Sequence, residues 1–377
     1  MDSLVNPRES LRATRLSGRF YRPELDVLRF VAFLMVYLTH TIQVVPGSPH
    51  WVIALSNATG FGVPIFFALS AYLITELLMI EKRRSGTVDL PAFYVRRCLR
   101  IWPLYFLLLF LGFALSRASS EEIPVSALLA YLFFVGNWYT SFHDFLPHAI
   151  GPLWSIPVEE QFYLFWPIFV RSLSRRGLGV LCCAGWTLSQ ATLIALCHWH
   201  NIAEPKIWTN SIVHLQYFAL GAGVSLYLDG AIPRIHGSLR SVMIGAALVI
   251  LFMSDFALNQ NTPDPPASFA QGYLELLFAG LATALLLFGF LGYGGLQKRT
   301  TLRYLGKISF GLYLFHIPCF TFLRKLAPHL LGHGSPLFSA VVGLPLTIGV
   351  AAVSYRYFES PFLRMKERFT VVQSRGI

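Results

Sequence analysis

The sequence predicts an all-α polytopic membrane protein with about ten transmembrane helices and one broken or re-entrant segment. Of its 377 residues, 55% are hydrophobic and only 13% are charged, whereas soluble domains carry about 25% charged residues. Apolar segments, many close to the roughly 20 residues that a membrane helix needs, recur along the chain. The net charge of +11 comes from Lys and Arg gathered in short connections and tails, which is typical of cytoplasmic helix ends rather than of a nucleic-acid-binding surface.

Eleven apolar segments recur, at about 25–45, 61–80, 101–116, 125–139, 162–170, 178–197, 212–228, 242–256, 273–292, 308–326 and 337–355. Both tails are basic and are expected in the cytoplasm, which requires an even number of crossings. One segment between Val125 and Val170 is therefore expected not to cross fully. Proline and glycine cluster there, so we predict ten crossings and a broken stretch around Gly151 to Glu160. Such backbone is tolerated at membrane depth only where protein buries it or where it lines a cavity.

These boundaries divide the chain into a basic cytoplasmic tail (1–21), a membrane domain (22–361) and a second cytoplasmic tail (362–377). The first tail lacks a short apolar core followed by a small-residue cleavage site, so we predict no signal peptide. We expect no second domain after Pro361. The five cysteines show no metal-ligand or redox spacing, which favours buried packing, and no bound metal or cofactor is expected.

Three polar residues interrupt the first apolar segment, within the stretch from Arg22 to His40. Arg29 and His40 are eleven residues apart, nearly three helical turns, so they lie on one face about 16 Å apart along the axis. Asp26 lies one turn before Arg29 and can pair with it. Ionisable groups inside a membrane segment are costly and suggest function. The alternative for His40 is a hydrogen bond that joins two helices.

A second cluster comprises Arg96, Arg97 and Arg100, which share one helical face just before an apolar segment. Arginine forks suit phosphate oxygens, so this cluster predicts an anion clamp at the cytoplasmic mouth. The alternative is ordinary positive charge at a cytoplasmic helix end. Arg29 is expected at the same membrane level.

A third group surrounds the adjacent carboxylates of Glu159 and Glu160, and its other members are Trp154, Ser155 and Tyr163. Carboxylates in a re-entrant stretch can orient an imidazole or bind a polyol. The alternative is stabilisation of a helix N-terminus by negative charge. His316, in LGKISFGLYLFHIP, is a further candidate, for which a packing role is an equal alternative. We find no pair of histidines with convincing metal-ligand spacing.

Six motifs cover the chain from about Arg22 to Pro361: LDVLRFVAFLMVYLTH, GVPIFFALSAYLIT, FYVRRCLRIWPLY, GPLWSIPVEEQFYLFWP, LRYLGKISFGLYLFHIP and YRYFESPF. In this order they resemble the acyltransferase-3 family of integral membrane O-acyltransferases. The resemblance implies about ten membrane helices, an acyl-CoA donor, and transfer of an acetyl or similar group to a hydroxyl. It also implies a bacterial inner-membrane location and a carbohydrate or lipid-linked glycan acceptor, such as lipopolysaccharide O-antigen or exopolysaccharide.

The resemblance also assigns roles. The family's paired Arg and His fall on Arg29 and His40, its arginine pair on Arg97 and Arg100, and its acidic pair on Glu159 and Glu160. On this basis His40 is the catalytic base, with a glutamate at 159 or 160 holding the imidazole. Donor-binding and supporting roles fall on Arg29, Arg97, Arg100, Asp26, Trp154, Ser155, Tyr163 and His316.

Two departures from the family pattern, Ala71 in place of a glycine and Pro157 within a small-residue run, remove no charge. They therefore bear on acceptor specificity more than on chemistry. A transporter or flippase of a glycan or small molecule is the main alternative, because broken helices and buried charges also occur in transporters. An acyltransferase for a non-sugar metabolite and a structural membrane subunit are further alternatives. The sequence leaves open the acyl group, the acceptor and an acyl-enzyme intermediate.

Overall fold

The computed structural model describes residues 20–117, 122–199, 204–258, 269–331, 333–370 and 372. Within these ranges every regular element is helical. Most of the predicted first tail (1–21), part of the predicted second tail (362–377) and most of the loop after the segment 242–256 lie outside the described residues.

The helices in chain order are α2 (Pro23–Thr41), α3 (His50–Gly60), α4 (Gly62–Ser85), α5 (Leu90–Ser116), α6 (Val125–Leu132), α7 (Gly136–Phe142), η1 (His148–Trp154), α8 (Ser155–Ser172), α9 (Arg175–Trp199), α10 (Glu204–Trp208), α11 (Ser211–Leu228), α12 (Gly237–Leu258), α13 (Phe269–Phe290), α14 (Gly294–Gln297), α15 (Thr300–Lys307), α16 (Ser309–Leu331), α17 (Pro336–Ser354), η2 (Tyr355–Glu359) and α18 (Ser360–Glu367).

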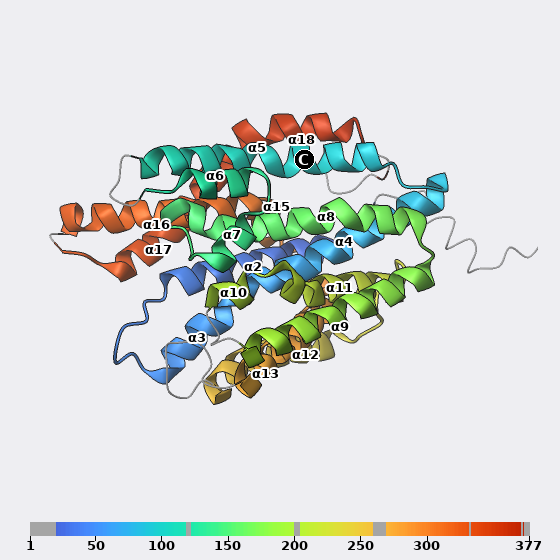
Figure 1. Ribbon diagram of the computed structural model, residues 1–377, viewed down its shortest axis with the longest axis horizontal. Coiled ribbons are helices and arrows are strands. Elements are labelled where there is room, and N and C mark those ends of the chain that lie inside the picture. The colour runs from blue at the N-terminus through green and yellow to red at the C-terminus, as the bar shows by residue number, and fades with distance from the viewer. Residues whose placement is uncertain are drawn as a thin grey trace, which may run out of the picture.

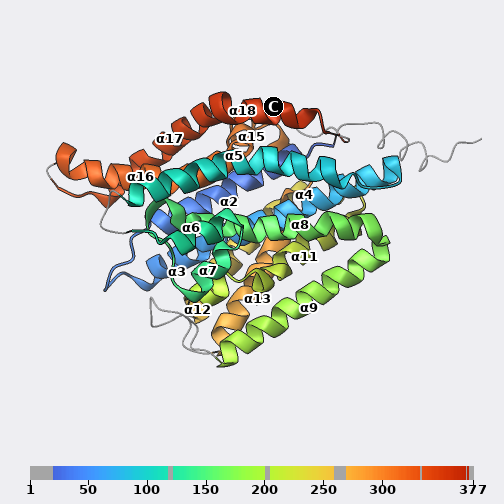
Figure 2. The same cartoon turned by 45° about the horizontal axis from the view of Figure 1, so that its top comes forward.

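The long helices lie side by side in one bundle, with α2 and α4 at its centre (Figure 1). On one side α4 packs along α11, and α11 packs along α9, while α12 and α13 form a pair beside them. On the other side α16 pairs with α17, and α5 contacts α18. The turned view shows α9 on the outer edge of the bundle (Figure 2). The central position of α2 places its polar residues against protein on several sides.

Seven helical segments are long and apolar enough to cross a membrane, or eight if the bent pair of α15 and α16 counts as one span. These segments support a multi-pass membrane protein, but they do not confirm the predicted number of ten. The helices α2 and α8 are absent from the set although both lie within the bundle. Each carries three charged residues in about 18 positions, and these include Asp26, Arg29, Glu159 and Glu160.

The region before α8 is broken, as the sequence suggested, but residues 155–160 of the predicted broken stretch belong to the continuous helix α8. Two short helices, α6 and α7, and the 3₁₀ helix η1 precede α8, and Phe134 between α6 and α7 has a positive φ of 56°. The sequence did not predict a second break, at Ile308, where α15 and α16 meet at 72°. This bend brings Ser309 and Phe310 to the wall of a pocket described below.

Two glycines let helices approach at backbone distance, as small residues commonly do in membrane bundles. A Cβ added at Gly221 of α11 would lie 2.0 Å from the carbonyl oxygen of Ala68 in α4. A Cβ added at Gly306 of α15 would lie 1.7 Å from the carbonyl oxygen of Asp26 in α2. Gly306 therefore sets how closely α15 packs against the polar end of α2.

The Gly306→Ala variant is expected to lower the midpoint of thermal unfolding in detergent, because the added methyl group would displace the backbone of Asp26. Overpacking of this kind costs about 1–3 kcal/mol. Gly349→Ala in α17 is the matched control, since a Cβ there meets no atom within 4 Å. Equal thermal midpoints for the two variants would contradict the proposed close packing.

Candidate active site

The polar end of α2 is held by a chain of hydrogen bonds. The Arg29 guanidinium forms an ion pair with Asp26, with 3.1 Å between Nη1 and Oδ1. The Tyr21 hydroxyl donates to the other carboxylate oxygen of Asp26 at 2.8 Å, and Arg303 donates to Tyr21 at 3.3 Å. Burial raises the pKa of Tyr21 above its ordinary value, so this hydroxyl keeps its proton. The predicted pairing of Asp26 with Arg29 is confirmed.

A pocket of about 970 Å³ opens at this end of the bundle, and we call it the mouth pocket. Its wall carries a high concentration of positive charge, supplied by α2, α5 and the chain near both ends. The basic residues that line it are Arg22, Arg29, Arg96, Arg97, Arg100 and Lys366. The arginines that the sequence assigned to an anion clamp therefore do gather around one opening.

The arginines of α5 differ in their partners. Arg96 is neutralised by Glu81, with 2.9 Å between Nη2 and Oε2. The Arg97 guanidinium lies over the rings of Phe93 and Tyr163, with 5.6 and 5.4 Å to the ring centroids. Among the described residues Arg97 forms neither a hydrogen bond nor an ion pair, and its buried Nε has no partner. Arg97 is thus a positioned cation whose charge is available to a ligand.

A second pocket of about 720 Å³, which we call the inner pocket, continues from the first. Arg29, Ser70, Arg97 and Arg100 line both pockets, so the two share one wall. Deeper residues of the inner pocket come from α8 and α16 and include Ser155, Glu159 and Tyr313. The lining therefore passes from cationic to mixed polar and aromatic.

The two adjacent glutamates face different surroundings. Glu159 lines the inner pocket and accepts a hydrogen bond from Tyr163, which in turn contacts Ser70. Because the phenol has one proton, Ser70 donates to Tyr163. Glu160 instead accepts from the indole of Trp102 at 3.1 Å, and its Oε1 is buried without a partner. Of the two, only Glu159 lines the pocket.

A hydroxyl pair forms the deep wall of the inner pocket. The Tyr313 hydroxyl donates to the carbonyl oxygen of Pro152 at 2.8 Å and lies 2.7 Å from the Ser155 hydroxyl. With the phenolic proton used on Pro152, Ser155 is the donor to Tyr313. The Tyr313 ring also lies beside that of His316, with 5.7 Å between ring centroids. Tyr313 therefore connects the inner pocket to the histidines.

Two imidazoles meet at the end of this path. His40 and His316 have ring centroids 5.1 Å apart in an edge-on arrangement. The Nδ1 of His40 lies 2.8 Å from the Val36 carbonyl, and the Nδ1 of His316 lies 2.5 Å from the Tyr313 carbonyl. A carbonyl oxygen only accepts, so each Nδ1 carries the proton and each neutral ring has its lone pair on Nε2.

The two rings differ in exposure. His40 is exposed, whereas His316 is fully buried and its Nε2 has no hydrogen-bond partner. An exposed imidazole with a free Nε2 lone pair can take a proton from an alcohol. The buried imidazole behind it can only exchange a proton or a hydrogen bond with its neighbour.

Three features differ from the sequence prediction. The first apolar segment was expected to extend to about residue 45, but α2 ends at Thr41, so His40 lies in its last turn. Its Nδ1 is oriented by Val36, and neither Glu159 nor Glu160 forms a hydrogen bond with it. Trp154 packs on His214, with ring centroids 5.7 Å apart, and lines neither pocket.

Sequence reasoning also missed residues. Tyr313, Ser70 and Tyr21 were not singled out, because the sequence contains 16 tyrosines and a tyrosine or serine in an apolar helix carries no distinctive signal. Glu359, in the motif YRYFESPF, interacts electrostatically with Arg100. A glutamate at the end of an apolar helix was the available signal for Glu359. Within the described residues no cluster of His, Cys, Asp and Glu could hold a metal ion.

Comparison with known proteins identifies a family. A family profile described as "Acyltransferase domain" (Acyl_transf_3) matches residues 22–356. The peptidoglycan O-acetyltransferase OatA of Listeria monocytogenes is 26% identical over 377 residues, covering 93% of this chain and 57% of that protein. The O-acetyltransferase OatA of Staphylococcus aureus is 26% identical over 380 residues, covering 95% and 60%. The chain thus spans about three fifths of the length of these relatives, and no solved structure matches it.

Proposed function

The chain belongs to the family of the Acyl_transf_3 acyltransferase domain, and from this premise we propose that it is an integral membrane O-acyltransferase. The proposed reaction moves an acetyl or similar group from acyl-CoA to a hydroxyl of a carbohydrate. The observation that supports it most is the wall shared by the two pockets, which includes Arg97. From this wall the inner pocket extends to Tyr313, whose ring lies beside that of His316.

We propose ten crossings, made of the eight apolar spans together with α2 and α8. Five of the six charged residues that keep these two helices outside the apolar set face protein or pockets, where charge in a membrane domain is tolerated, and the sixth, Arg171, is exposed in the last turn of α8. Both tails then lie on the cytoplasmic side of a bacterial inner membrane, as the basic connections favour. The mouth pocket opens to the cytoplasm, and His40 lies towards the opposite side.

The mouth pocket suits the phosphates of CoA. Arg97 forms no ion pair among the described residues and lies over two aromatic rings, and Arg29 and Arg100 line the same wall. Charge-assisted hydrogen bonds from arginine to phosphate are among the stronger polar contacts in proteins. The pantetheine arm then extends through the inner pocket past Ser155 and Tyr313, and it carries the thioester towards the histidines.

His40 is the proposed general base. Its Nε2 takes the proton of the acceptor hydroxyl, the oxygen bonds to the thioester carbonyl carbon, and the carbon–sulfur bond breaks. The CoA thiolate leaves and recovers the proton from the imidazolium, so protons and charge balance. The Val36 carbonyl keeps Nδ1 protonated and so keeps the lone pair on Nε2. Glu159, held by Tyr163, is proposed as a hydrogen-bonding wall of the donor path.

The proposed acceptor is a glycan hydroxyl that approaches the exposed His40 from the side opposite the mouth pocket. A named relative is a peptidoglycan O-acetyltransferase, which favours a cell-envelope carbohydrate as the class. Lipopolysaccharide, exopolysaccharide and peptidoglycan all present such hydroxyls. Mass spectrometry of envelope glycans with and without the gene distinguishes among these three acceptors.

A transporter is the rival function, because buried charge and broken helices also serve transport. Proteoliposomes that contain the protein, labelled acetyl-CoA and a glycan acceptor separate the two. Acetyl ester formation on the acceptor is expected for an acyltransferase. Movement of the glycan across the membrane without ester formation would overturn the proposal in favour of transport.

His316→Phe is expected to lower kcat by about 10- to 100-fold, the loss that follows removal of a hydrogen bond to a charged group. The phenyl ring keeps the packing against Phe33 and Tyr37 but removes the Nε2 that can share the proton of His40. The KM for acyl-CoA should stay unchanged. A variant with normal kcat, or one that raises KM alone, would rule out this role for His316.

A further inference from the structure

A third hollow lies outside the proposed catalytic path. It is an open groove of about 1510 Å³ formed mainly by α9 and α11, with Phe288 of α13 also on its wall. It shares no lining residue with the mouth pocket or the inner pocket. Figure 2 shows α9 on the outer edge of the bundle, so the groove is available to a molecule in the surrounding membrane.

Glycines make the groove wide. Gly179 of α9 and Gly223 of α11 both line it, and a Cβ added at either would meet no atom within 4 Å. No close helix contact therefore requires these glycines, in contrast to Gly221, two residues before Gly223, where a Cβ would meet Ala68. A glycine inside a helix costs about 1 kcal/mol relative to alanine. The open space above these positions can accept a chain from outside the protein.

The groove has the length of one membrane leaflet. Along α9 its lining begins at Arg175 and reaches Thr187, which is twelve residues further and therefore about 18 Å of helix. Half of the hydrocarbon core of a bilayer is about 15 Å. At the arginine end stands Tyr227, which is 78% exposed, and exposed tyrosines are enriched at the level of lipid headgroups.

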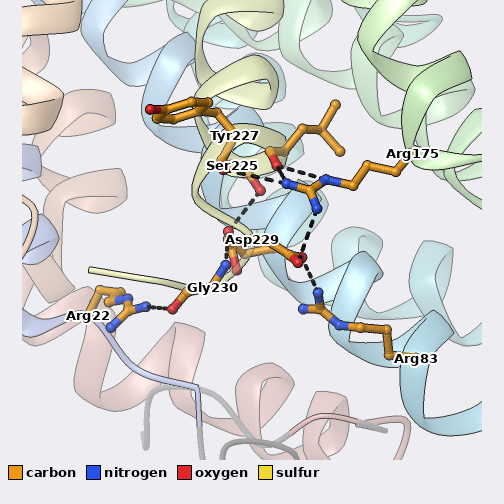
Figure 3. A network of polar contacts seen from close by, with 9 residues as sticks. Arg22, Arg83, Arg175, Ser225, Tyr227, Asp229 and Gly230 are labelled. Atoms are coloured by element: carbon orange, nitrogen blue, oxygen red, sulfur yellow. Dashed lines mark hydrogen bonds and ion pairs between the residues drawn. The ribbon is translucent and has the colours of Figure 1, made fainter. Parts of the chain in front are cut away.

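The arginine end is positively charged and rigidly held (Figure 3). Arg175 of α9 pairs with Asp229 at 3.1 Å and donates to the Leu226 carbonyl at the end of α11. Arg83 of α4 reaches the same Asp229 carboxylate. Arg176 also lines the groove, is exposed, and forms no ion pair among the described residues. Two arginines, Arg175 and Arg176, therefore line this end of the groove, which suits an anionic headgroup.

We propose that this groove binds an anionic phospholipid, with its phosphate at Arg175 and Arg176 and an acyl chain along the wall formed by Gly179 and Gly223. The bound lipid fills the space between α9 and α11. The site is separate from the proposed acyl transfer and does not depend on it.

The test is native mass spectrometry of the purified full chain in detergent with equal amounts of palmitoyl-oleoyl phosphatidylglycerol and phosphatidylcholine. Wild type is expected to retain phosphatidylglycerol in preference. Arg176→Gln should reduce that preference about fivefold, the selectivity that one basic residue near a membrane surface supplies. Gly223→Phe should remove one bound lipid by filling the groove.

Gly185→Phe is the control for Gly223→Phe, because Gly185 lies in the facing helix α9 with open space at its Cβ but does not line the groove. It should bind lipid as wild type does. Equal retention of the two lipids by wild type would overturn the proposal, as would unchanged lipid binding in Gly223→Phe. If Gly223→Phe fails to fold, Arg176→Gln still decides, and an unchanged preference in that variant refutes the site.

Discussion

His40→Ala is expected to reduce acyl transfer by about 10²- to 10⁴-fold, the contribution typical of a general base. The reason is that His40 is exposed, that its contact with Val36 leaves the lone pair on Nε2, and that it lies beside His316, whose ring contacts Tyr313 of the inner pocket. His316 cannot replace it, because that ring is fully buried. The measurement is the initial rate of label transfer from acetyl-CoA in membranes that contain equal amounts of each protein.

His236→Ala is the control for this variant. His236 lies in the exposed connection between α11 and α12, where its imidazole bonds to Ser238, so its loss should leave the rate unchanged. Equal accumulation in the membrane shows that His40→Ala still folds. Acyl transfer within a few fold of wild type in His40→Ala would remove His40 from the mechanism.

Arg97→Ala is expected to raise the KM for acyl-CoA by about 10- to 150-fold with a smaller change in kcat. Hydrogen bonds to charged groups are worth about 1.5–3 kcal/mol, and Arg97 lies over the rings of Phe93 and Tyr163 and forms no ion pair among the described residues. Because the phosphates bind equally in the ground and transition states, their loss should appear in KM. Steady-state kinetics with varied acetyl-CoA at saturating acceptor measure the effect.

Arg117→Gln is the matched control, since Arg117 terminates the same helix at its other end, is exposed, and pairs with Glu122 among the described residues. It should leave both constants unchanged. Arg97→Lys should fall between wild type and Arg97→Ala, because lysine keeps the charge but not the planar fork. An unchanged KM for acyl-CoA in Arg97→Ala would show that the mouth pocket does not bind the donor.

Helical spacing explains which site features could be predicted from the sequence. Asp26 and Arg29 are one turn apart, and their ion pair follows from that spacing alone. The same holds for the shared face of Arg97 and Arg100, both of which line the mouth pocket. The all-helical class follows from the long apolar segments, and the break before α8 follows from its prolines and glycines.

Contacts between distant segments could not be predicted in this way. The approach of Tyr313 to Ser155 joins residues 158 positions apart, and no local pattern distinguishes that tyrosine from the others. The choice between Glu159 and Glu160 depends on where Trp102 and Tyr163 lie, which only the packing of α5 against α8 decides. The end of α2 at Thr41, instead of at about residue 45, likewise depends on packing, and it places His40 in the last turn of the helix.

The most direct test of the proposed reaction is transfer of labelled acetyl groups from acetyl-CoA to envelope carbohydrate in membranes that contain the full chain. We expect alkali-labile label in the carbohydrate fraction with wild type and background label with His40→Ala. Background label with correctly folded wild type would contradict acyl transfer along the path from Arg97 to His40. Equal label in membranes without the protein would contradict it as well.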